Sequence, residues 1–214
     1  MAIDVGHSNT SPGAISARGV PEFEFNAALA KVIRDTLSLR GTPVLSIGDD
    51  GTMVDLRLRT RTAADGGATF FLSIHHDSAD ARYLQPWEWQ GERRSYTDQF
   101  SGFSLFVSRK NPQVEASLHC ASAIGAALKE QGFHATLHHA ESIPGENREW
   151  ADQSNGVYYY DDLVVLKTAA MPAVLLEAGV IVNRDEEQAI QRPEMRSAIS
   201  AAVERGLIAC GVIE

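Results

Sequence analysis

The chain has 214 residues, of which 44% are hydrophobic and 22% are charged, and its formal net charge is −9. This length and composition are typical of one globular domain, so residues 1–214 are expected to fold as a unit. The acidic balance, with no basic stripe to offset it, argues against a nucleic-acid partner. No apolar run approaches the roughly 20 residues that cross a bilayer. No secretory leader precedes the first apolar run, so we expect a chain made without a leader or one whose leader was removed.

Apolar residues recur along the chain at the spacings of strands and helices in alternation. The first apolar run, Ala2–Val5, predicts a strand, and a loop rich in Ser, Gly and Pro leads from it to a helix at 22–40. Further helices are predicted, in chain order, at 54–65, 114–131, 184–191 and 194–210. Further strands are predicted at 44–47, 69–74, 103–108, 133–139 and 173–176, with a short strand or turn at 163–166. This alternation predicts an α/β fold, a single domain with a mostly parallel, twisted sheet flanked by helices on both faces.

Some segments and residues receive structural interpretations only. The stretches at 78–101 and 140–161 show no clean period and are interpreted as long connections, which in compact domains are usually functional or disordered. Cys120 and Cys210 lie in predicted helices and are interpreted as buried thiols, with a bridge between them left open. The arginines of the helix at 54–65 are interpreted as a solvated face; these are Arg57, Arg59 and Arg61.

Three of the predicted strands each end in a side chain that can bind a metal ion or move a proton. These side chains are His7, His75 and Glu177. In open α/β sheets, ligands bind beyond the carboxyl ends of the strands, so the three are expected to face one crevice. Glu22 joins them from the start of the helix at 22–40, on its buried face and with no Lys or Arg at 25 or 26 to pair with. A metal ion would relieve the cost of burying that carboxylate.

Two histidines and one carboxylate are a common ligand set for zinc in hydrolases, with a fourth position left for water. A further glutamate that is not a ligand would take the proton of that water. Each of these residues alone is more often structural. A single His after a strand usually makes its hydrogen bonds within its own loop, and the charge of Glu22 suits a helix N-terminus. Together they favour a metal site, although the pattern alone leaves both interpretations open.

Four segments of the chain match, in order, the motifs of one enzyme family. Ile3-Asp4-Val5-Gly6-His7, followed by Pro12-Gly13-Ala14, resembles an opening I-D-x-G-H-G-G and D-P-G-A, and Gly19-x-x-Glu22 resembles G-x-x-E. Phe71 to His75 resembles F-x-S-I-H, and Pro172 to Gly179, with Asn183 and Glu186 or Glu187, resembles P-x-x-L-x-E-x-G-F-x-x-N. These motifs run from residue 2 to about 187. They resemble those of the Amidase_3 family, zinc-dependent N-acetylmuramoyl-L-alanine amidases that cut bacterial peptidoglycan.

The resemblance implies a role for each matched residue. It implies that His7, Glu22 and His75 hold one Zn²⁺ ion and that Glu177 acts as general base and then as general acid. The implied substrate is peptidoglycan, cut at the amide that joins the lactyl group of muramic acid to L-alanine of the stem peptide. Four departures from the family pattern leave these residues intact and affect only the rim of the site; they are Val5 for Pro, Ser8-Asn9 for Gly-Gly, His76-Asp77 for Ala-Asn, and Val180 for Phe.

Other side chains receive weaker assignments. His76 is a rival to His75 as a ligand and is expected to point the other way, because neighbouring strand residues alternate. Four further histidines match no motif and have no partner at ligand spacing; they are His119, His134, His138 and His139. Of these, the adjacent residues His138 and His139 could touch substrate. Aromatic residues of the long connections could stack on sugar or anchor the loops; they are Trp87, Trp89, Trp150 and Tyr158 to Tyr160.

The connection at 78–101 directly follows the predicted strand that ends at His75. It is therefore expected to act as a lid over the crevice or as a regulatory element. We expect a monomer that acts with a separate regulatory or wall-targeting partner. We expect the protein to lie in the periplasm or the extracellular cell envelope if a leader was removed; phage-encoded release stays open. An alternative is another zinc amidohydrolase or a carboxypeptidase acting on cell-wall peptides, which would need an Arg for a terminal carboxylate. A third reading, a non-catalytic envelope-binding protein, would require a damaged site.

Overall fold

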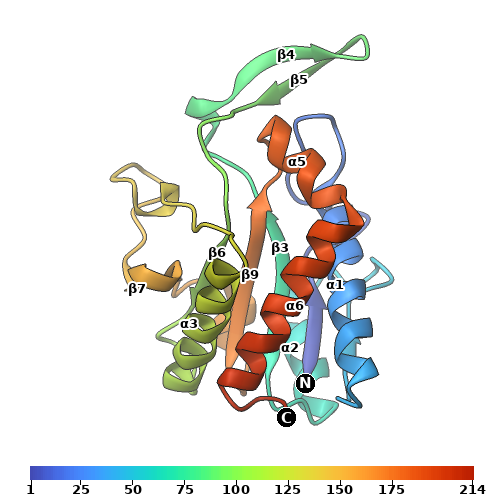
Figure 1. The fold of residues 1–214 in the computed structure, drawn as a ribbon, viewed down its shortest axis with the longest axis vertical. Helices are drawn as coiled ribbons and strands as arrows, with labels where there is room; N and C mark the ends of the chain where they lie inside the picture. The colour runs from blue at the N-terminus through green and yellow to red at the C-terminus, as the bar shows by residue number, and fades with distance from the viewer.

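The structure, a computed structural model, describes all residues 1–214. It is built around one seven-stranded sheet, which lies between helices (Figure 1). The strand order is β2-β1-β3-β9-β6-β8-β7. The strands are β1 (Ala2–Val5), β2 (Leu45–Ile47), β3 (Phe71–Asp77), β6 (Ser104–Val107), β7 (Trp150–Asp152), β8 (Val157–Tyr159) and β9 (Ala173–Val180). Strands β2, β1, β3 and β9 run parallel, β6 is antiparallel to β9, and β7 is antiparallel to β8. The predicted α/β class with a mostly parallel sheet is confirmed.

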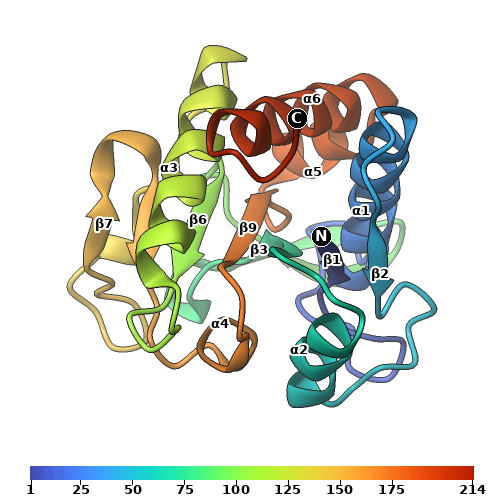
Figure 2. The same ribbon diagram turned by 90° about the horizontal axis from the view of Figure 1, so that it is seen from below.

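Helices cover both faces of the sheet, as predicted (Figure 2). They are α1 (Glu22–Leu39), α2 (Leu56–Asp65), α3 (Val114–Glu130), α4 (Val164–Thr168), α5 (Arg184–Gln191) and α6 (Pro193–Ala209). Helices α1, α3 and α6 pack on one face through a core of 26 buried residues, and α2 and α4 pack on the other through a core of 12. None of the helices combines the length and the apolar character that crossing a bilayer requires.

The alternation of side chains along β3 and β9 decides where the site lies. Leu72 and Ile74 of β3 belong to the core shared with α1, α3 and α6, whereas Phe71 belongs to the core shared with α2 and α4. Because successive strand residues point to opposite faces, His75 extends the face of Phe71 beyond the carboxyl end of the core. Glu177 of β9 likewise lies on the same face as Ala173 and Leu175, which belong to the core shared with α2 and α4.

Three of the predicted segments differ from the structure. The predicted strand at 133–139 is wrong: its only ladder contact is a bridge between Phe103 and Ala135, and it runs into a 3₁₀ turn at His138–Ala140. Residues 164–166 belong to the helix α4 and Leu163 caps its start, so the segment is not a strand or turn; a short apolar run fits either state. The connection at 140–161 contributes β7 and β8 to the sheet edge.

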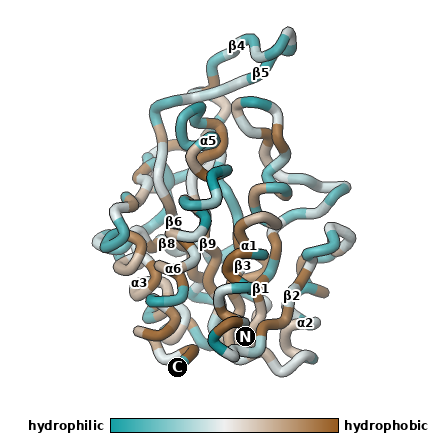
Figure 3. The backbone as a smooth tube through the Cα atoms, turned by 45° about the vertical axis from the view of Figure 1, so that its right-hand side comes forward, coloured by the Kyte–Doolittle hydropathy of each residue, from teal (hydrophilic) through white to brown (hydrophobic).

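The connection at 78–101 also contains regular structure. A 3₁₀ turn, Ala81–Tyr83, precedes an antiparallel hairpin of β4 (Gln85–Trp89) and β5 (Glu92–Tyr96). Gln90 and Gly91 join the strands with φ values of 52° and 80°, as a two-residue type I′ turn requires. The hairpin projects beyond α5 at the end of the molecule where β3 and β9 finish (Figure 1), and its chain is largely hydrophilic (Figure 3).

A disulfide joins Cys120 of α3 to Cys210, the residue that follows α6, with a Cα–Cα distance of 5.1 Å. The interpretation of both cysteines as buried thiols is therefore wrong. Sequence could not decide the pairing, because the two residues are 90 positions apart and meet only when α3 packs beside α6.

We expect the Cys120→Ala/Cys210→Ala variant to have a free energy of unfolding about 2–4 kcal/mol below that of the oxidised protein, because the cross-link restricts the unfolded chain. Denaturant unfolding under non-reducing conditions measures the difference. A reducing agent should destabilise the unmodified protein in the same way and leave the double variant unchanged. Equal unfolding midpoints for the two oxidised proteins would contradict the stabilising role of the bridge.

Candidate active site

The structure brings His7, Glu22 and His75 together at the carboxyl ends of β1 and β3. Both histidines face the Glu22 carboxylate: His7 Nε2 lies 3.0 Å from Oε2, and His75 Nδ1 lies 3.0 Å from Oε1. The three candidate ligand atoms all lie within 4.8 Å of one another. This arrangement gathers two imidazoles and one carboxylate, the set of donors that the sequence predicted.

Close approach of the chain at two glycines makes this arrangement possible. A Cβ atom at Gly6 would lie 2.2 Å from His75 Nε2, and one at Gly13 would lie 2.4 Å from Glu22 Oε2. His7 itself has a φ of 70°, in the left-handed region, which turns the chain sharply after β1. Side chains at either glycine would therefore displace the imidazole or the carboxylate of the cluster.

Glu22 is 4% exposed and its carboxylate has no Lys or Arg partner. It accepts hydrogen bonds from Ala14 N (3.0 Å) and Asn26 Nδ2 (3.1 Å) in addition to its contacts with the histidines. Burial acts to raise the pKa of the carboxyl, but His7 and His75 outweigh it and hold that pKa well below its ordinary value. Glu22 is therefore a buried anion that faces two ring nitrogens.

His76 points away from this cluster, as predicted. Its Nδ1 lies 2.8 Å from Asn26 Oδ1, and the amide group of Asn26 donates to the Gly6 carbonyl (3.2 Å). Burial lowers the pKa of His76 to about 3, so its ring is neutral. His76 thus braces the start of α1 behind Glu22 and contributes no donor atom to the cluster.

Glu177 of β9 lies beside His75, since the two residues are paired in the parallel ladder of β3 and β9. On its other side it pairs with Ser104 of β6. Both Glu177 Oε2 and Ser104 Oγ are buried without a hydrogen-bond partner. Burial, and then the charges of Asp77 and Glu22, raise the pKa of Glu177 well above its ordinary value. The structure therefore places a carboxyl group without a hydrogen-bond partner next to His75.

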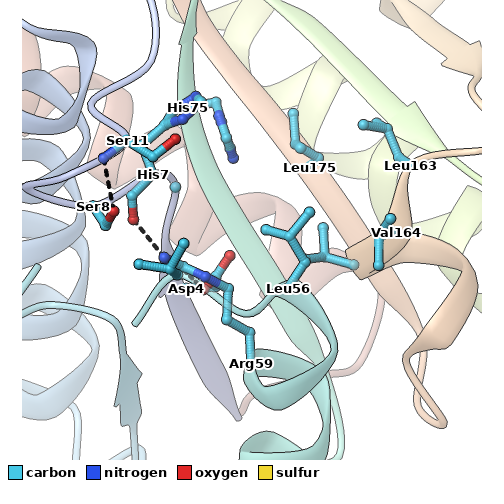
Figure 4. Close-up of a pocket in the computed structure, with 13 residues that line it drawn as sticks. Asp4, His7, Ser8, Ser11, Leu56, Arg59, His75, Leu163, Val164 and Leu175 are labelled. Atoms are coloured by element: carbon cyan, nitrogen blue, oxygen red, sulfur yellow. Dashed lines mark hydrogen bonds and ion pairs between the residues drawn. The ribbon is translucent and has the colours of Figure 1, made fainter. Parts of the chain in front are cut away.

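A pocket of about 210 Å³ opens beside the histidines (Figure 4). His7 and His75 lie at one end, and apolar side chains from α2 and from the start of α4 lie across from them. The apolar lining consists of Val54, Leu56, Leu163, Val164, Val165 and Leu175. A concave, largely apolar pocket with a few polar groups at one end is typical of a small-molecule binding site.

Beneath His7 lies a buried ion pair that sequence reasoning missed. Arg59 is 1% exposed and its Nη1 lies 2.7 Å from Asp4 Oδ1, while its guanidinium also donates to the carbonyls of Val5, His7 and Met53. The assignment of Arg59 to a solvated face is therefore wrong, although Arg57 and Arg61 are exposed. A signal was available, because Asp4 interrupts an apolar strand and a buried carboxylate requires a partner.

Two glutamates after β9 fix the loops around the site. Glu186 accepts hydrogen bonds from Gly102 N (2.8 Å) and Val180 N (2.9 Å). Glu187 is fully buried and accepts from Ser16 Oγ (2.6 Å) and Arg18 Nη1 (2.8 Å). These contacts tie α5 to the end of β9, to the segment just before β6 and to the loop that precedes Glu22.

A second group with two imidazoles and a carboxylate lies at the end of β3, formed by Asp77, His138 and His139. The expectation that His138 and His139 have no partner at ligand spacing is therefore wrong. Burial acts to lower the pKa of His139, but Asp77 and Glu146 outweigh it and raise that pKa to about 9. The signal was absent from the sequence because Asp77 lies 62 residues away from His139.

The aromatic residues of the two connections make contacts within the protein. Trp87 donates from Nε1 to the Ala17 carbonyl (2.9 Å) and stacks on Trp89, and Trp150 stacks on Tyr158. No residue of the β4–β5 hairpin lines the pocket beside the histidines. These contacts fit the role of loop anchors; stacking on sugar and action as a lid stay predictions.

A mostly parallel α/β sheet with two imidazoles and a carboxylate at the carboxyl ends of its strands has the donor set and the location typical of metal-dependent hydrolases. The sequence profile of the Amidase_3 family, described as N-acetylmuramoyl-L-alanine amidase, matches residues 1–209. The chain therefore belongs to the N-acetylmuramoyl-L-alanine amidase family, and it is an enzyme of that class.

Individual relatives and solved structures agree with this placement. The N-acetylmuramoyl-L-alanine amidase AmiA of Escherichia coli is 26% identical over 97% of this chain and 74% of its own length. The probable amidase AmiB of Haemophilus influenzae is 25% identical over 98% of this chain and 51% of its own. The solved structure of the amidase Ami1 from Mycobacterium smegmatis shares the fold, with a TM-score of 0.76 and 19% identity over 99% of this chain and 96% of its own.

Proposed function

We propose that this amidase hydrolyses the bond between N-acetylmuramic acid and L-alanine in bacterial peptidoglycan, with one Zn²⁺ ion held by His7, Glu22 and His75. The observation that carries the proposal is the buried Glu22 carboxylate, which faces two ring nitrogens and no Lys or Arg. Two His and one carboxylate fit zinc in a catalytic site, which needs three protein ligands and one open position. The adjacent pocket supports that assignment because it reaches His7 and His75.

Bound zinc supplies a Lewis acid for a carbonyl oxygen and lowers the pKa of water from 15.7 to about 7. The chain's own proton carrier is Glu177, whose Oε2 has no competing partner. Its carboxylate takes a proton from the attacking water as the water oxygen bonds to the lactyl carbonyl carbon. It then delivers that proton to the nitrogen of L-alanine as the carbon–nitrogen bond breaks. The products are a lactyl carboxylate and a stem peptide with a free amine.

The carboxypeptidase alternative would need a free Arg in the pocket to bind a terminal carboxylate. The arginine that lines the pocket is Arg59, and its guanidinium is already paired with Asp4 and with three backbone carbonyls. No observation favours that alternative, but its products differ from those of an amidase, so one experiment separates the two.

Purified peptidoglycan, incubated with the zinc-loaded protein, is expected to release stem peptides that begin at L-alanine, as identified by mass spectrometry. A chelator should abolish the release and added Zn²⁺ should restore it, because the proposed reaction depends on the ion held by His7, Glu22 and His75. Release of single amino acids would identify a carboxypeptidase instead. Absence of products from both peptidoglycan and a small muropeptide, with zinc bound, would refute the assignment.

We propose an envelope location, outside the reducing cytosol. The Cys120–Cys210 disulfide supports it, since disulfides persist mainly in oxidising compartments. We also propose that the β4–β5 hairpin is a regulatory element or a docking point for a wall-targeting partner, on a monomeric enzyme. Replacing 85–96 by a short Gly-Ser linker should change the rate on peptidoglycan relative to the rate on a small muropeptide. An unchanged ratio would exclude this role.

A further inference from the structure

The second cluster lies on the same sheet face as the first, beyond Glu177. Asp77 ends β3, two residues after His75, and His138 and His139 form the 3₁₀ turn that follows α3. His139 Nε2 lies 2.7 Å from Asp77 Oδ2, and His138 Nε2 lies 3.3 Å from the same oxygen. Three candidate ligand atoms thus converge on one point, as in the cluster of His7, Glu22 and His75.

The other nitrogen of each ring is already engaged. His138 Nδ1 lies 2.7 Å from Thr136 Oγ1, and His139 Nδ1 lies 2.9 Å from Glu146 Oε2. Histidines that bind metals almost always donate their second ring N–H to a carboxylate, a carbonyl or another acceptor, which fixes the tautomer and the ring orientation. Thr136 and Glu146 are placed for this role, and they leave both Nε2 atoms directed at Asp77.

Hydrogen bonds within the protein leave one nitrogen of this cluster, His138 Nε2, without a partner. A proton on His139 Nε2 would account for its contact with Asp77, but His138 Nε2 would still face the carboxylate without a hydrogen bond. His138 is 3% exposed, so water does not compensate that nitrogen. An unpaired buried polar atom is costly. A divalent cation between the three atoms would engage both Nε2 atoms and Asp77 Oδ2 at once.

We propose that Asp77, His138 and His139 form a second divalent-metal site, with the donor set that suits zinc. Its histidine side chains are 2% and 9% exposed, compared with 29% and 16% for His7 and His75, so this ion is shielded from substrate. Its role is to fix the turn at His138–Ala140 to the end of β3, next to Glu177. The proposal does not depend on the occupancy of the first site.

Metal content separates the two sites. Tag-free protein, equilibrated with Zn²⁺ or Co²⁺ and then freed of excess metal, is expected to hold two ions per chain. The His7→Ala/His75→Ala variant should keep one ion, and adding His138→Ala/His139→Ala to it should remove that ion. His119→Ala is the matched control, because His119 is exposed on α3 and belongs to neither cluster. Circular dichroism checks that each variant is folded.

A milder variant tests the second site without removing a ligand. Glu146→Gln should weaken metal binding by roughly 10- to 100-fold in the His7→Ala/His75→Ala background, as loss of a supporting carboxylate does in other metal sites. Competition with a chelator of known affinity measures this change. A folded His7→Ala/His75→Ala variant that binds no ion would overturn the proposal. Retention of the ion after all four histidines are replaced would place it elsewhere and overturn the proposal equally.

Discussion

Glu177→Gln is expected to slow release of stem peptides from peptidoglycan by roughly 100- to 10,000-fold, the usual contribution of a general acid–base group. Glutamine keeps the size of the side chain but cannot accept a proton from water or deliver one to the leaving nitrogen. The metal content should stay unchanged, because the Glu177 carboxyl makes no hydrogen bond or ion pair with His7, Glu22 or His75 in the structure. Initial rates and metal analysis on the same preparation measure both effects.

Glu115→Gln is the matched control for this variant, since Glu115 is an exposed glutamate in the first turn of α3 and belongs to neither cluster. Its rate should equal that of the unmodified protein. Loss of metal from Glu177→Gln would show that Glu177 is a ligand. Retention of full activity would show that another group moves the proton.

Arg59→Leu is expected to lower the free energy of unfolding by about 3–5 kcal/mol, because it leaves the buried Asp4 carboxylate without its cation. Ser73 Oγ still donates to Asp4 (2.6 Å), but a hydroxyl does not compensate a buried charge. The variant also frees the carbonyl of His7, so we expect weaker metal binding along with lower stability. Urea unfolding and metal competition measure the two losses.

Arg57→Leu and Arg61→Leu provide controls on the same helix, because both arginines are exposed. Each should change stability by less than about 0.5 kcal/mol, as surface substitutions usually do. The Asp4→Asn/Arg59→Leu double variant should lose less stability than the sum of its single changes, since the two side chains interact directly. Equal effects of Arg59→Leu and Arg57→Leu would show that the ion pair contributes nothing.

Local sequence predicted the sheet and the positions of the main site residues because both follow from short-range patterns. The apolar runs before His7, His75 and Glu177 are buried strands of a parallel sheet, and their carboxyl ends meet at one edge. The amphipathic pattern after Pro21 placed Glu22 on the buried face of α1. These elements are continuous and strongly periodic, which is why their ends could be assigned.

Contacts between distant segments could not be predicted. The Cys120–Cys210 bridge and the group of Asp77 with His138 and His139 both require helices or turns to be packed before their partners can be known. The β4–β5 hairpin gave a partial signal, in the alternation of Trp87 and Trp89 before a glycine, but Gln90 is an unusual residue for a left-handed turn position. The periodicity of the sequence therefore predicted the positions of helices and strands better than it predicted which distant side chains are in contact.

The ladder that pairs His75 with Glu177 sets the spacing between a candidate metal ligand and the proposed proton carrier by main-chain hydrogen bonds of neighbouring strands. Strand separation in a sheet is nearly constant, at about 4.8 Å. That spacing is therefore insulated from changes of length or sequence in the loops at 8–20, 78–101 and 140–149. Insertions there can alter which glycan strands and stem peptides gain access, while the reacting groups keep their distance. The loops at the rim of the pocket can therefore vary in length and sequence, while the backbone of β3 and β9 keeps His75 and Glu177 at a fixed spacing.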